Sequence, residues 1–284
     1  MQLPETRPLV ETQTHSMEQK IVLITGASSG IGGATARTLA AAGYRVFGGV
    51  RRLDSVTSVP GIEWIQLDVQ DEESVAAAVR VIIERTGRID ILVNNAGVSL
   101  VGPVEATSIA EAGALFDVNV FGVLRVVRAV LPSMRSRRSG LIVNISSVLG
   151  FLPAPFMGLY ASSKHALEGL SESLDHEVRS FGVRIVLLEP SFTNTNLDTN
   201  ATRTKAVIKD YAAALACSVD AVRQQVSNAP PPDEVAKKVL AIAEGTRQFR
   251  QPADGRAKLL SFLRRFAPSG QVDKSLRRAF GLEA

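Results

Sequence analysis

The sequence predicts a single α/β domain: a doubly wound parallel sheet of about seven strands, with helices on both faces and a helical extension at the C-terminus. Short aliphatic runs alternate with longer segments of helical character as far as residue 190. The first run ends in a glycine-rich turn, and a helix follows at once. With 284 residues, of which 45% are hydrophobic and 21% charged, the chain can bury a large core.

Six aliphatic runs are predicted to be strands, at residues 20–25, 45–50, 62–67, 89–93, 141–146 and 183–188. Helices are expected from residue 31 and at residues 71–85, 112–137, 160–181 and 233–244. Residues 191–228 lack strand character and begin with a Thr- and Asn-rich stretch, so we expect a mobile connection that leads into one or two short helices. Alternating strands and helices imply a parallel sheet covered on both faces.

The chain is expected to have three parts. Residues 1–17 are polar and are predicted to be a disordered extension, residues 18–255 form the α/β domain, and residues 256–284 form a basic helical extension. Residues 1–16 lack the apolar centre of a secretory signal, so we expect a cytoplasmic protein.

Composition excludes several classes of protein. Charges interrupt the longest aliphatic stretch, 121–134, so no run reaches the roughly 18 residues of a membrane-spanning helix. The single cysteine, Cys217, excludes an intramolecular disulfide. His15, His165 and His176 do not have the spacing of metal ligands, so we expect no metal site.

The basic residues are unevenly distributed. The formal net charge of +4 comes from 32 basic and 28 acidic residues, but residues 256–284 alone hold seven Lys or Arg against two acids. The rest of the chain is nearly neutral, which argues against a nucleic-acid-binding face. The basic segment is either a solvated helical tail or a surface for an acidic membrane or partner, and the sequence leaves both open.

The turn after the first strand reads Thr25-Gly26-Ala27-Ser28-Ser29-Gly30-Ile31-Gly32. Backbone amides and a helix N-terminus can face an anionic group there, and glycine is needed where a phosphate approaches the backbone. Because a strand precedes the turn and a helix follows it, we expect it to bind a dinucleotide.

Three further motifs follow in order: Asn94-Asn95-Ala96-Gly97, Ser147 and Tyr160-x-x-x-Lys164. Together with the glycine turn they resemble the short-chain dehydrogenase/reductase (SDR) family, over residues 20–195. The resemblance implies a Rossmann fold and an oxidoreductase that uses a nicotinamide dinucleotide, and it leans toward the steroid and retinoid dehydrogenase branch.

The end of the second strand bears on the choice of cofactor. An acid there would bind the ribose 2′-hydroxyl, whereas this chain has Arg51 and Arg52, whose guanidinium groups suit a 2′-phosphate, with the hydroxyl of Ser29 nearby. We therefore predict NADP(H), with NAD(H) as the alternative. The expected cofactor-binding residues, several of them implied by the resemblance, are Gly26, Ser28, Ser29, Gly30, Ile31, Gly32, Arg51, Arg52, Asp68, Val69, Asn94, Ala96, Gly97, Tyr160, Lys164, Pro190, Thr193 and Thr195.

One departure from the family pattern follows the sixth predicted strand. The family usually has Pro-Gly where this chain has Pro190-Ser191. Losing the glycine is expected to shift the loop around the nicotinamide carboxamide, while Thr193 and Thr195 supply hydroxyl groups for that amide.

The catalytic residues are expected to be Tyr160, Lys164, Ser147 and Asn119. Tyr160 and Lys164 are four apart on a predicted helix and so share one face, where the lysine charge can favour the phenolate. By resemblance, Tyr160 exchanges a proton with the substrate oxygen, and Lys164 also holds the nicotinamide ribose. The resemblance further implies that Ser147 bonds the substrate oxygen and that Asn119 holds a water molecule linking Lys164 to solvent.

Residues 148–159 carry no charge, which suits a hydrophobic secondary alcohol, ketone or aldehyde beside Ser147, Leu149, Phe151, Phe156 and Met157. The same residues could instead pack against the segment after residue 195 or against a subunit. The resemblance implies a homodimer or homotetramer. Two other functions would also use a dinucleotide site: a non-catalytic dinucleotide-sensing regulator, and a sugar-nucleotide epimerase or dehydratase, for which the segment after residue 195 is short.

Overall fold

The computed structural model describes residues 19–246 and 248–282, so the prediction for residues 1–17 lies outside the described part. Its main sheet has seven strands in the order β3-β2-β1-β4-β6-β7-β9, and every neighbouring pair is parallel. These strands are β1 (Ile21–Thr25), β2 (Arg45–Val50), β3 (Ile62–Gln66), β4 (Ile91–Asn94), β6 (Gly140–Ile145), β7 (Val183–Glu189) and β9 (Arg250–Pro252). The predicted doubly wound sheet is confirmed.

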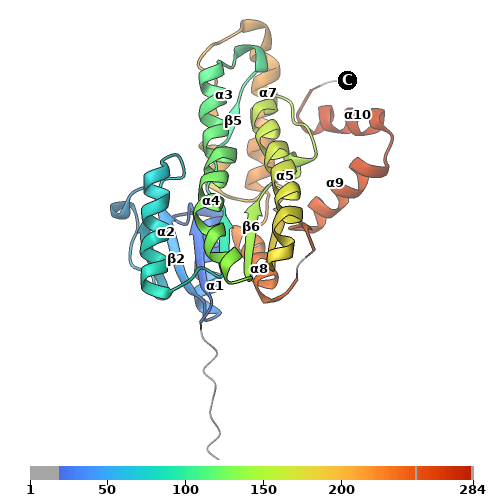
Figure 1. Ribbon diagram of the computed structural model, residues 1–284. Helices are drawn as coiled ribbons and strands as arrows, with labels where there is room; N and C mark the ends of the chain where they lie inside the picture. The colour runs from blue at the N-terminus through green and yellow to red at the C-terminus, as the bar shows by residue number, and fades with distance from the viewer. Residues whose placement is uncertain (1–18, 247, 283–284) are drawn as a thin grey trace, which may run out of the picture.

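Two layers of helices cover the sheet (Figure 1). Side chains alternate along β1: Ile21 and Leu23 pack with α2, α4 and α5 on one face, and Val22 and Ile24 pack with α1 and α8 on the other. The bounds of these helices are α1 (Gly30–Ala41), α2 (Glu72–Thr86), α4 (Gly122–Ser136), α5 (Gly158–Val178) and α8 (Pro232–Glu244).

The long helix predicted at residues 112–137 is interrupted. α3 (Ile109–Phe116) runs into a π-helical turn, Asp117–Phe121, before α4 begins. In that turn Asn119 bonds both backbone groups of Val98, its Oδ1 accepting from N–H and its Nδ2 donating to C=O, each at 2.9 Å. Hydrophobic periodicity does not report such a contact with a distant loop, and a single wide turn is a common feature of functional sites.

Two strand pairings were not predicted. β9 pairs with β7. It is only three residues long, which is too short to show the alternation of side chains that predicts a strand. β5 (Leu100–Val101) pairs with β8 (Thr202–Arg203), so the expectation that residues 191–228 contain no strand is wrong at 202–203. Both pairings depend on contacts between distant segments rather than on local propensity.

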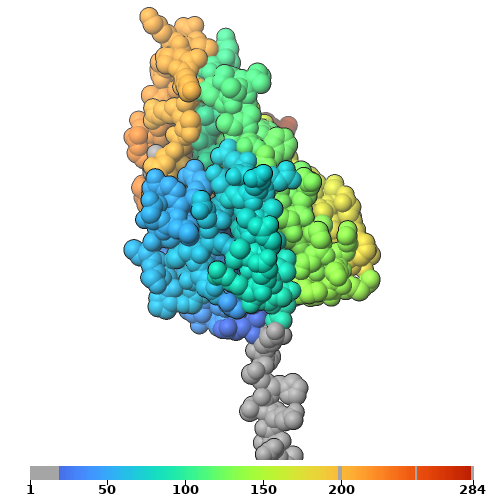
Figure 2. Space-filling view, turned by 60° about the vertical axis from the view of Figure 1, so that its left-hand side comes forward, coloured from blue at the N-terminus to red at the C-terminus, as the bar shows by residue number. Residues whose placement is uncertain are grey.

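A mainly helical lobe lies beyond the carboxyl ends of the strands. α6 (Asn196–Thr199), α7 (Ala212–Ser227), α9 (Gly255–Phe266) and α10 (Ser269–Ala279) contribute to it, and its apolar cluster joins Met157 and Tyr160 to Val222 and Phe280. Figure 2 shows the part around α7, in orange, above the blue N-terminal half. Short 3₁₀ turns lie at Leu53–Ser55, Val104–Ala106, Val148–Gly150, Arg179–Phe181 and Lys209–Tyr211. None of the helices in the described ranges is long and apolar enough to cross a membrane.

Candidate active site

A cavity of about 480 Å³ lies at the carboxyl ends of the strands, where the lobe meets the sheet. This is the edge at which doubly wound sheets bind their ligands. Most of the predicted site residues line it: Gly26, Ser28, Ser29, Gly30, Ile31, Arg51, Asp68, Val69, Ala96, Gly97, Ser147, Leu149, Met157, Tyr160, Lys164, Pro190, Thr193 and Thr195. Gly32, Arg52, Asn94, Asn119, Phe151 and Phe156 do not.

The glycine turn has the geometry of a cradle. Gly26 and Gly30 have positive φ angles of 65° and 55°, and a Cβ on Gly26 would lie 2.9 Å from the Cα of Ala96. Ser29 is the N-cap of α1, yet its side chain makes no capping hydrogen bond. The first backbone N–H groups of α1 are therefore not satisfied by this side chain, as is typical of a turn that receives an anion.

Gly32 does not line the cavity, but it packs against the glycine turn and Asn95. A Cβ on Gly32 would lie 2.3 Å from Nδ2 of Asn95 and 2.4 Å from the carbonyl oxygen of Gly26. Asn95 Nδ2 donates to the carbonyl oxygens of Thr25 and Gly26, at 3.0 Å each. Gly32 therefore leaves room for the amide that ties the turn to the loop after β4.

Of the two neighbouring asparagines, the one predicted to bind the cofactor, Asn94, does not line the cavity. Asn94 is 3% exposed and donates through Nδ2 to Oδ1 of Asn144, at 2.8 Å, in the interior between β4 and β6. Asn95 lines the cavity instead. Successive side chains of a strand point to opposite sides, so a register of one residue decides which of the two reaches the site.

The two arginines after β2 are also separated. Arg51 lines the cavity, whereas Arg52 is exposed and pairs with Asp54 at 3.3 Å. Asp68 lines the same end of the cavity and accepts a hydrogen bond from the backbone of Gln70 at 3.0 Å. Cationic and anionic side chains thus meet at the end of the cavity next to the glycine turn.

Tyr160 and Lys164 project from the first turns of α5 and are 5% and 6% exposed. The Nζ of Lys164 donates to the carbonyl oxygen of Ile145 at 3.0 Å and lies 5.8 Å from the centre of the Tyr160 ring. Burial lowers the pKa of Lys164 to about 8. An ammonium held beside a phenol in this way favours the phenolate form.

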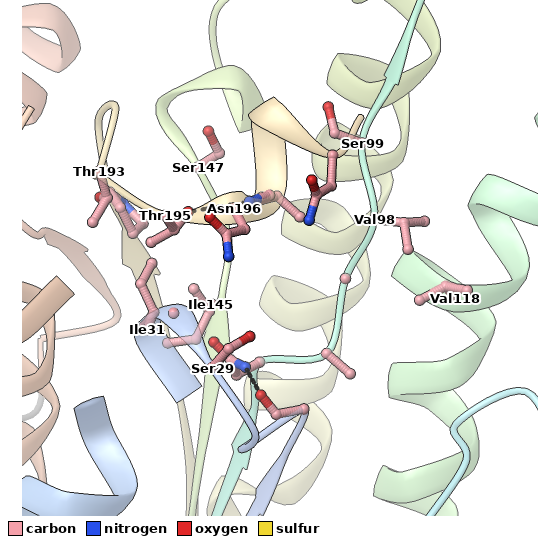
Figure 3. A pocket seen from close by; sticks show the side chains of 18 of the residues that line it. Ser29, Ile31, Val98, Ser99, Val118, Ile145, Ser147, Thr193, Thr195 and Asn196 are labelled. Atoms are coloured by element: carbon pink, nitrogen blue, oxygen red, sulfur yellow. Dashed lines mark hydrogen bonds between the residues drawn. The ribbon is translucent and has the colours of Figure 1, made fainter. Parts of the chain in front are cut away.

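The two serines at the end of β6 differ in their partners. Ser147 Oγ accepts a hydrogen bond from the N–H of Leu149 at 3.1 Å, and Figure 3 shows its side chain among the residues around the cavity. Ser146 donates instead to the buried carboxylate of Glu168. The carboxylate of Glu168 also forms an ion pair with Arg250. The same arginine lies 3.0 Å from the carboxylate of Glu189, whose pKa is raised by burial to about 7.

Asn119 does not line the cavity, but it lies close to Lys164. Besides bonding Val98, its Nδ2 donates to Oγ of Ser163 at 3.0 Å. The point that a Cβ on Gly97 would occupy is 3.4 Å from Oδ1 of Asn119 and 4.0 Å from Nζ of Lys164. Gly97 therefore leaves a space between the two polar groups.

The structure separates the residues predicted for the substrate wall. Leu149 and Met157 line the cavity, whereas Phe151 and Phe156 pack into the apolar cluster of the lobe. Phe156, at φ 59°, makes an edge-to-face contact with Tyr211 at 6.3 Å between ring centres. Residues that sequence reasoning missed complete this side: Val98, Ser99, Val118, Phe192, Asn196, Leu197, Asn200 and Thr202.

Ser99 is the notable member of this group. It is 2% exposed, and its Oγ has no hydrogen-bond partner among the described residues. Figure 3 shows it across the cavity from Ser147 and Thr193. The position of Ser99 follows from the pairing of β5 with β8, so no local signal could have identified it.

The loop after β7 is held without the usual glycine. The backbone N–H and Oγ of Ser191 donate to Oδ2 of Asp254, at 3.2 and 2.8 Å. Thr193 and Thr195 line the cavity (Figure 3). A side chain at position 191 thus adds an anchor for the loop instead of a clash.

This fold and site define a class of protein. The family model for short chain dehydrogenases matches residues 20–206, and the chain belongs to the short-chain dehydrogenase/reductase family of oxidoreductases. Within it, the chain is similar to the 3-ketodihydrosphingosine reductase of Bacteroides thetaiotaomicron, at 36% identity over 80% of this chain and 84% of that protein. It is also similar to estradiol 17-beta-dehydrogenase 1 of Rattus norvegicus, at 42% identity over 63% of this chain and 56% of that protein. The predicted resemblance to the steroid and retinoid dehydrogenase branch is confirmed.

Solved structures of short-chain dehydrogenases have a similar fold. A short-chain dehydrogenase of Streptomyces avermitilis has a TM-score of 0.78 and 36% identity, over 93% of this chain and 97% of that one. A Burkholderia cenocepacia short chain dehydrogenase in complex with NADP has a TM-score of 0.72 and 25% identity, over 91% and 97%. A Burkholderia phymatum relative in complex with NAD has a TM-score of 0.77 and 27% identity, over 94% and 97%. Relatives with this fold therefore bind either nicotinamide dinucleotide.

Proposed function

We propose that this protein is an NADP(H)-dependent oxidoreductase that transfers hydride between the nicotinamide and a hydrophobic secondary alcohol, ketone or aldehyde. The observation that carries the proposal is the meeting of Tyr160, Lys164 and Ser147 in one cavity with the glycine turn. A sugar-nucleotide epimerase or dehydratase would need a larger substrate lobe than the one present here.

The residues present fit a dinucleotide. The close approach of Gly26 to Ala96 leaves backbone exposed where a Cβ would block it, and the N-terminus of α1 faces the same space. Arg51 and Ser29 would hold a 2′-phosphate, Asp68 and Val69 the adenine, Ala96 and Gly97 the ribose, and Thr193 and Thr195 the carboxamide. When bound, the nicotinamide supplies or accepts the hydride.

Side chains of the protein exchange the proton with the substrate oxygen. Tyr160 donates a proton to a carbonyl oxygen or takes one from an alcohol, and the ammonium of Lys164 keeps the phenolate accessible near neutral pH. Ser147 accepts the N–H of Leu149, so its own hydrogen is available to donate to the substrate oxygen and stabilise developing charge. The space beside Gly97 gives room for a water molecule between Asn119 and Lys164, which connects the lysine to solvent.

The test of this chemistry is Tyr160→Phe. Turnover should fall by about 10²- to 10⁴-fold, since a general acid–base is lost, while NADPH binding measured by fluorescence persists. Wild type without turnover on any steroid, retinoid, aromatic or short aliphatic carbonyl, yet with tight NADPH binding, would favour a non-catalytic dinucleotide-sensing regulator.

The cofactor preference is tested at Arg51. Arg51→Asp should raise KM for NADPH and lower it for NADH, because a carboxylate repels the 2′-phosphate and accepts the 2′-hydroxyl. Arg52→Asp is the matched control: the same charge change next to the cavity, at a side chain that does not line it. Equal effects of the two variants would remove the role given to Arg51, and a wild type that prefers NADH would assign the chain to NAD(H).

The substrate class rests on the apolar residues that line the cavity together with Tyr160. Leu149, Met157, Phe192 and Leu197 give it apolar side chains. The names of two relatives refer to a sterol-like and a sphingoid substrate, both largely apolar. A carbonyl panel graded by apolar size should give kcat/KM values that rise with the buried apolar area.

Family membership also supports a proposal about assembly. We propose a homodimer or homotetramer formed through α4 and α5, on which Phe121 and Leu124 are 50% and 37% exposed near the start of α4. Sedimentation of wild type and Phe121→Glu would test it: the variant should shift to a smaller species.

A further inference from the structure

The outer face of α9 is apolar although it faces solvent. Leu259, Phe262, Leu263 and Phe266, which we call the α9 stripe, are 56%, 59%, 39% and 65% exposed. Their spacing of three, four and seven residues places them on one face of the helix. The rings of Phe262 and Phe266 lie 4.9 Å apart, so the stripe is continuous over its second half.

This exposure is not the ordinary frayed end of a tail, because α9 is anchored on its other face. Ala257 is fully buried, and Leu260 packs against the apolar cluster of the lobe. Asp254 caps the helix by accepting from the N–H of Ala257 at 2.8 Å. The helix therefore presents the stripe in a fixed orientation, at the side of the molecule where α9 and α10 project (Figure 1).

The surroundings of the stripe are strongly basic. Residues 255–279 contain seven basic side chains and one acid, Asp273. Four of the basic residues lie on α9, which has no acid of its own: Arg256, Lys258, Arg264 and Arg265. An apolar face with aromatic side chains and cationic neighbours is the composition of a helix that lies in the headgroup region of a membrane.

We propose that the α9 stripe docks on an anionic lipid surface. Phe262, Phe266 and Leu259 enter the boundary between headgroups and acyl chains, and Lys258 and Arg265 contact the lipid phosphates and carboxylates. A second copy of this helix is a poorer occupant, because it would bring four like charges against four without an acid to pair them.

The position of α9 gives the docking a consequence for the cavity. Asp254, at the base of α9, binds Ser191 of the cavity wall, and the guanidinium of Arg256 lies 5.8 Å from the ring centre of Phe192, another lining residue. A lipid surface held by α9 therefore lies beside the cavity. This consequence rests on the proposed function: an apolar alcohol or ketone dissolved in the bilayer would reach the site without crossing water.

The experiment uses the full chain and vesicles of phosphatidylcholine with or without phosphatidylserine, sedimented at low and high salt. Wild type should bind the anionic vesicles about tenfold or more tightly than the neutral ones, and high salt should weaken this preference. The double variant Phe262→Ser with Phe266→Ser, and separately Lys258→Glu with Arg265→Glu, should each lose about tenfold in binding.

Two controls separate docking from general damage. Leu53→Ser removes an apolar side chain that is 48% exposed elsewhere, and Lys238→Glu reverses an exposed charge on α8; both should bind anionic vesicles as wild type does. NADPH binding and the urea midpoint should be unchanged in the α9 variants, so that failure of docking and failure of the proposed function are read independently.

Three results would overturn the proposal: no sedimentation with anionic vesicles, equal binding to neutral ones, or α9 variants that bind like wild type. A change of the sedimentation coefficient in the Phe262→Ser, Phe266→Ser variant, with vesicle binding absent in wild type, would instead assign the stripe to contact between copies of this chain.

Discussion

Replacing Lys164 by methionine should make the protein more stable at neutral pH while abolishing its activity. Burial lowers the pKa of Lys164 from 10.5 to about 8 in the folded state, which at 1.36 kcal/mol per unit costs about 3 kcal/mol at pH 7. Methionine removes this cost but leaves the carbonyl oxygen of Ile145 without its donor, a loss of about 1–2 kcal/mol. The net gain is about 1–2 kcal/mol.

The dependence of this gain on pH identifies its cause. The folded state binds fewer protons at Lys164 than the unfolded chain does, so wild-type stability rises as the pH increases from about 8 toward 10.5. At about pH 9.5 the charge penalty has fallen by about 2 kcal/mol, and the advantage of Lys164→Met should disappear.

Urea unfolding of wild type and Lys164→Met at both pH values measures the difference directly. Lys238→Met, at an exposed lysine on α8, is the matched control and should show no comparable change with pH. A difference between wild type and Lys164→Met that is the same at both pH values, or a variant that is less stable at pH 7, would refute the reasoning.

Three further outcomes follow from the packing around the site. Gly32→Ala should weaken NADPH binding and cost about 1–3 kcal/mol of stability, because its Cβ must displace the Asn95 amide; thermal unfolding and fluorescence titration check both, and unchanged binding would contradict the argument. Asn119→Ala should cost about 2–4 kcal/mol in urea unfolding, since the N–H and C=O of Val98 lose their partner; a loss below 1 kcal/mol would mean that water replaces it. Arg250→Met should destabilise the protein by about 3–5 kcal/mol at pH 8, because the buried carboxylates of Glu168 and Glu189 lose their partner. The loss should be smaller near pH 5.5, where Glu189, whose pKa burial raises to about 7, is protonated; an equal loss at both pH values would count against this.

The parts of the fold that could be predicted are those in which local pattern and packing agree. Most of the longer strands are aliphatic runs because a parallel sheet buries both faces, although β3 contains Glu63 and Gln66. The glycines at 26 and 30 occupy positions whose positive φ angles few other residues adopt. β9 and the β5–β8 pair escaped prediction because two or three residues have no detectable period.

The candidate site shows the same division. The spacing of Tyr160 and Lys164 is a helical repeat, so the sequence alone places both side chains on one face. Which of Asn94 and Asn95 reaches the cavity, and whether Phe151 and Phe156 line it, depends on strand register and on how the lobe packs.

The sequence by itself determined the order of the six longer strands and the helices between them, the glycine turn, and the placement of Tyr160 and Lys164 on one helix face, because each of these is encoded within a few neighbouring positions. Only the tertiary structure decided that Ser99 and Phe192 face the cavity, that Asn119 bonds Val98 across a π-helical turn, and that the α9 stripe faces solvent. Those features arise where segments far apart in the chain meet, and the free energy of such contacts depends on burial that no local pattern records.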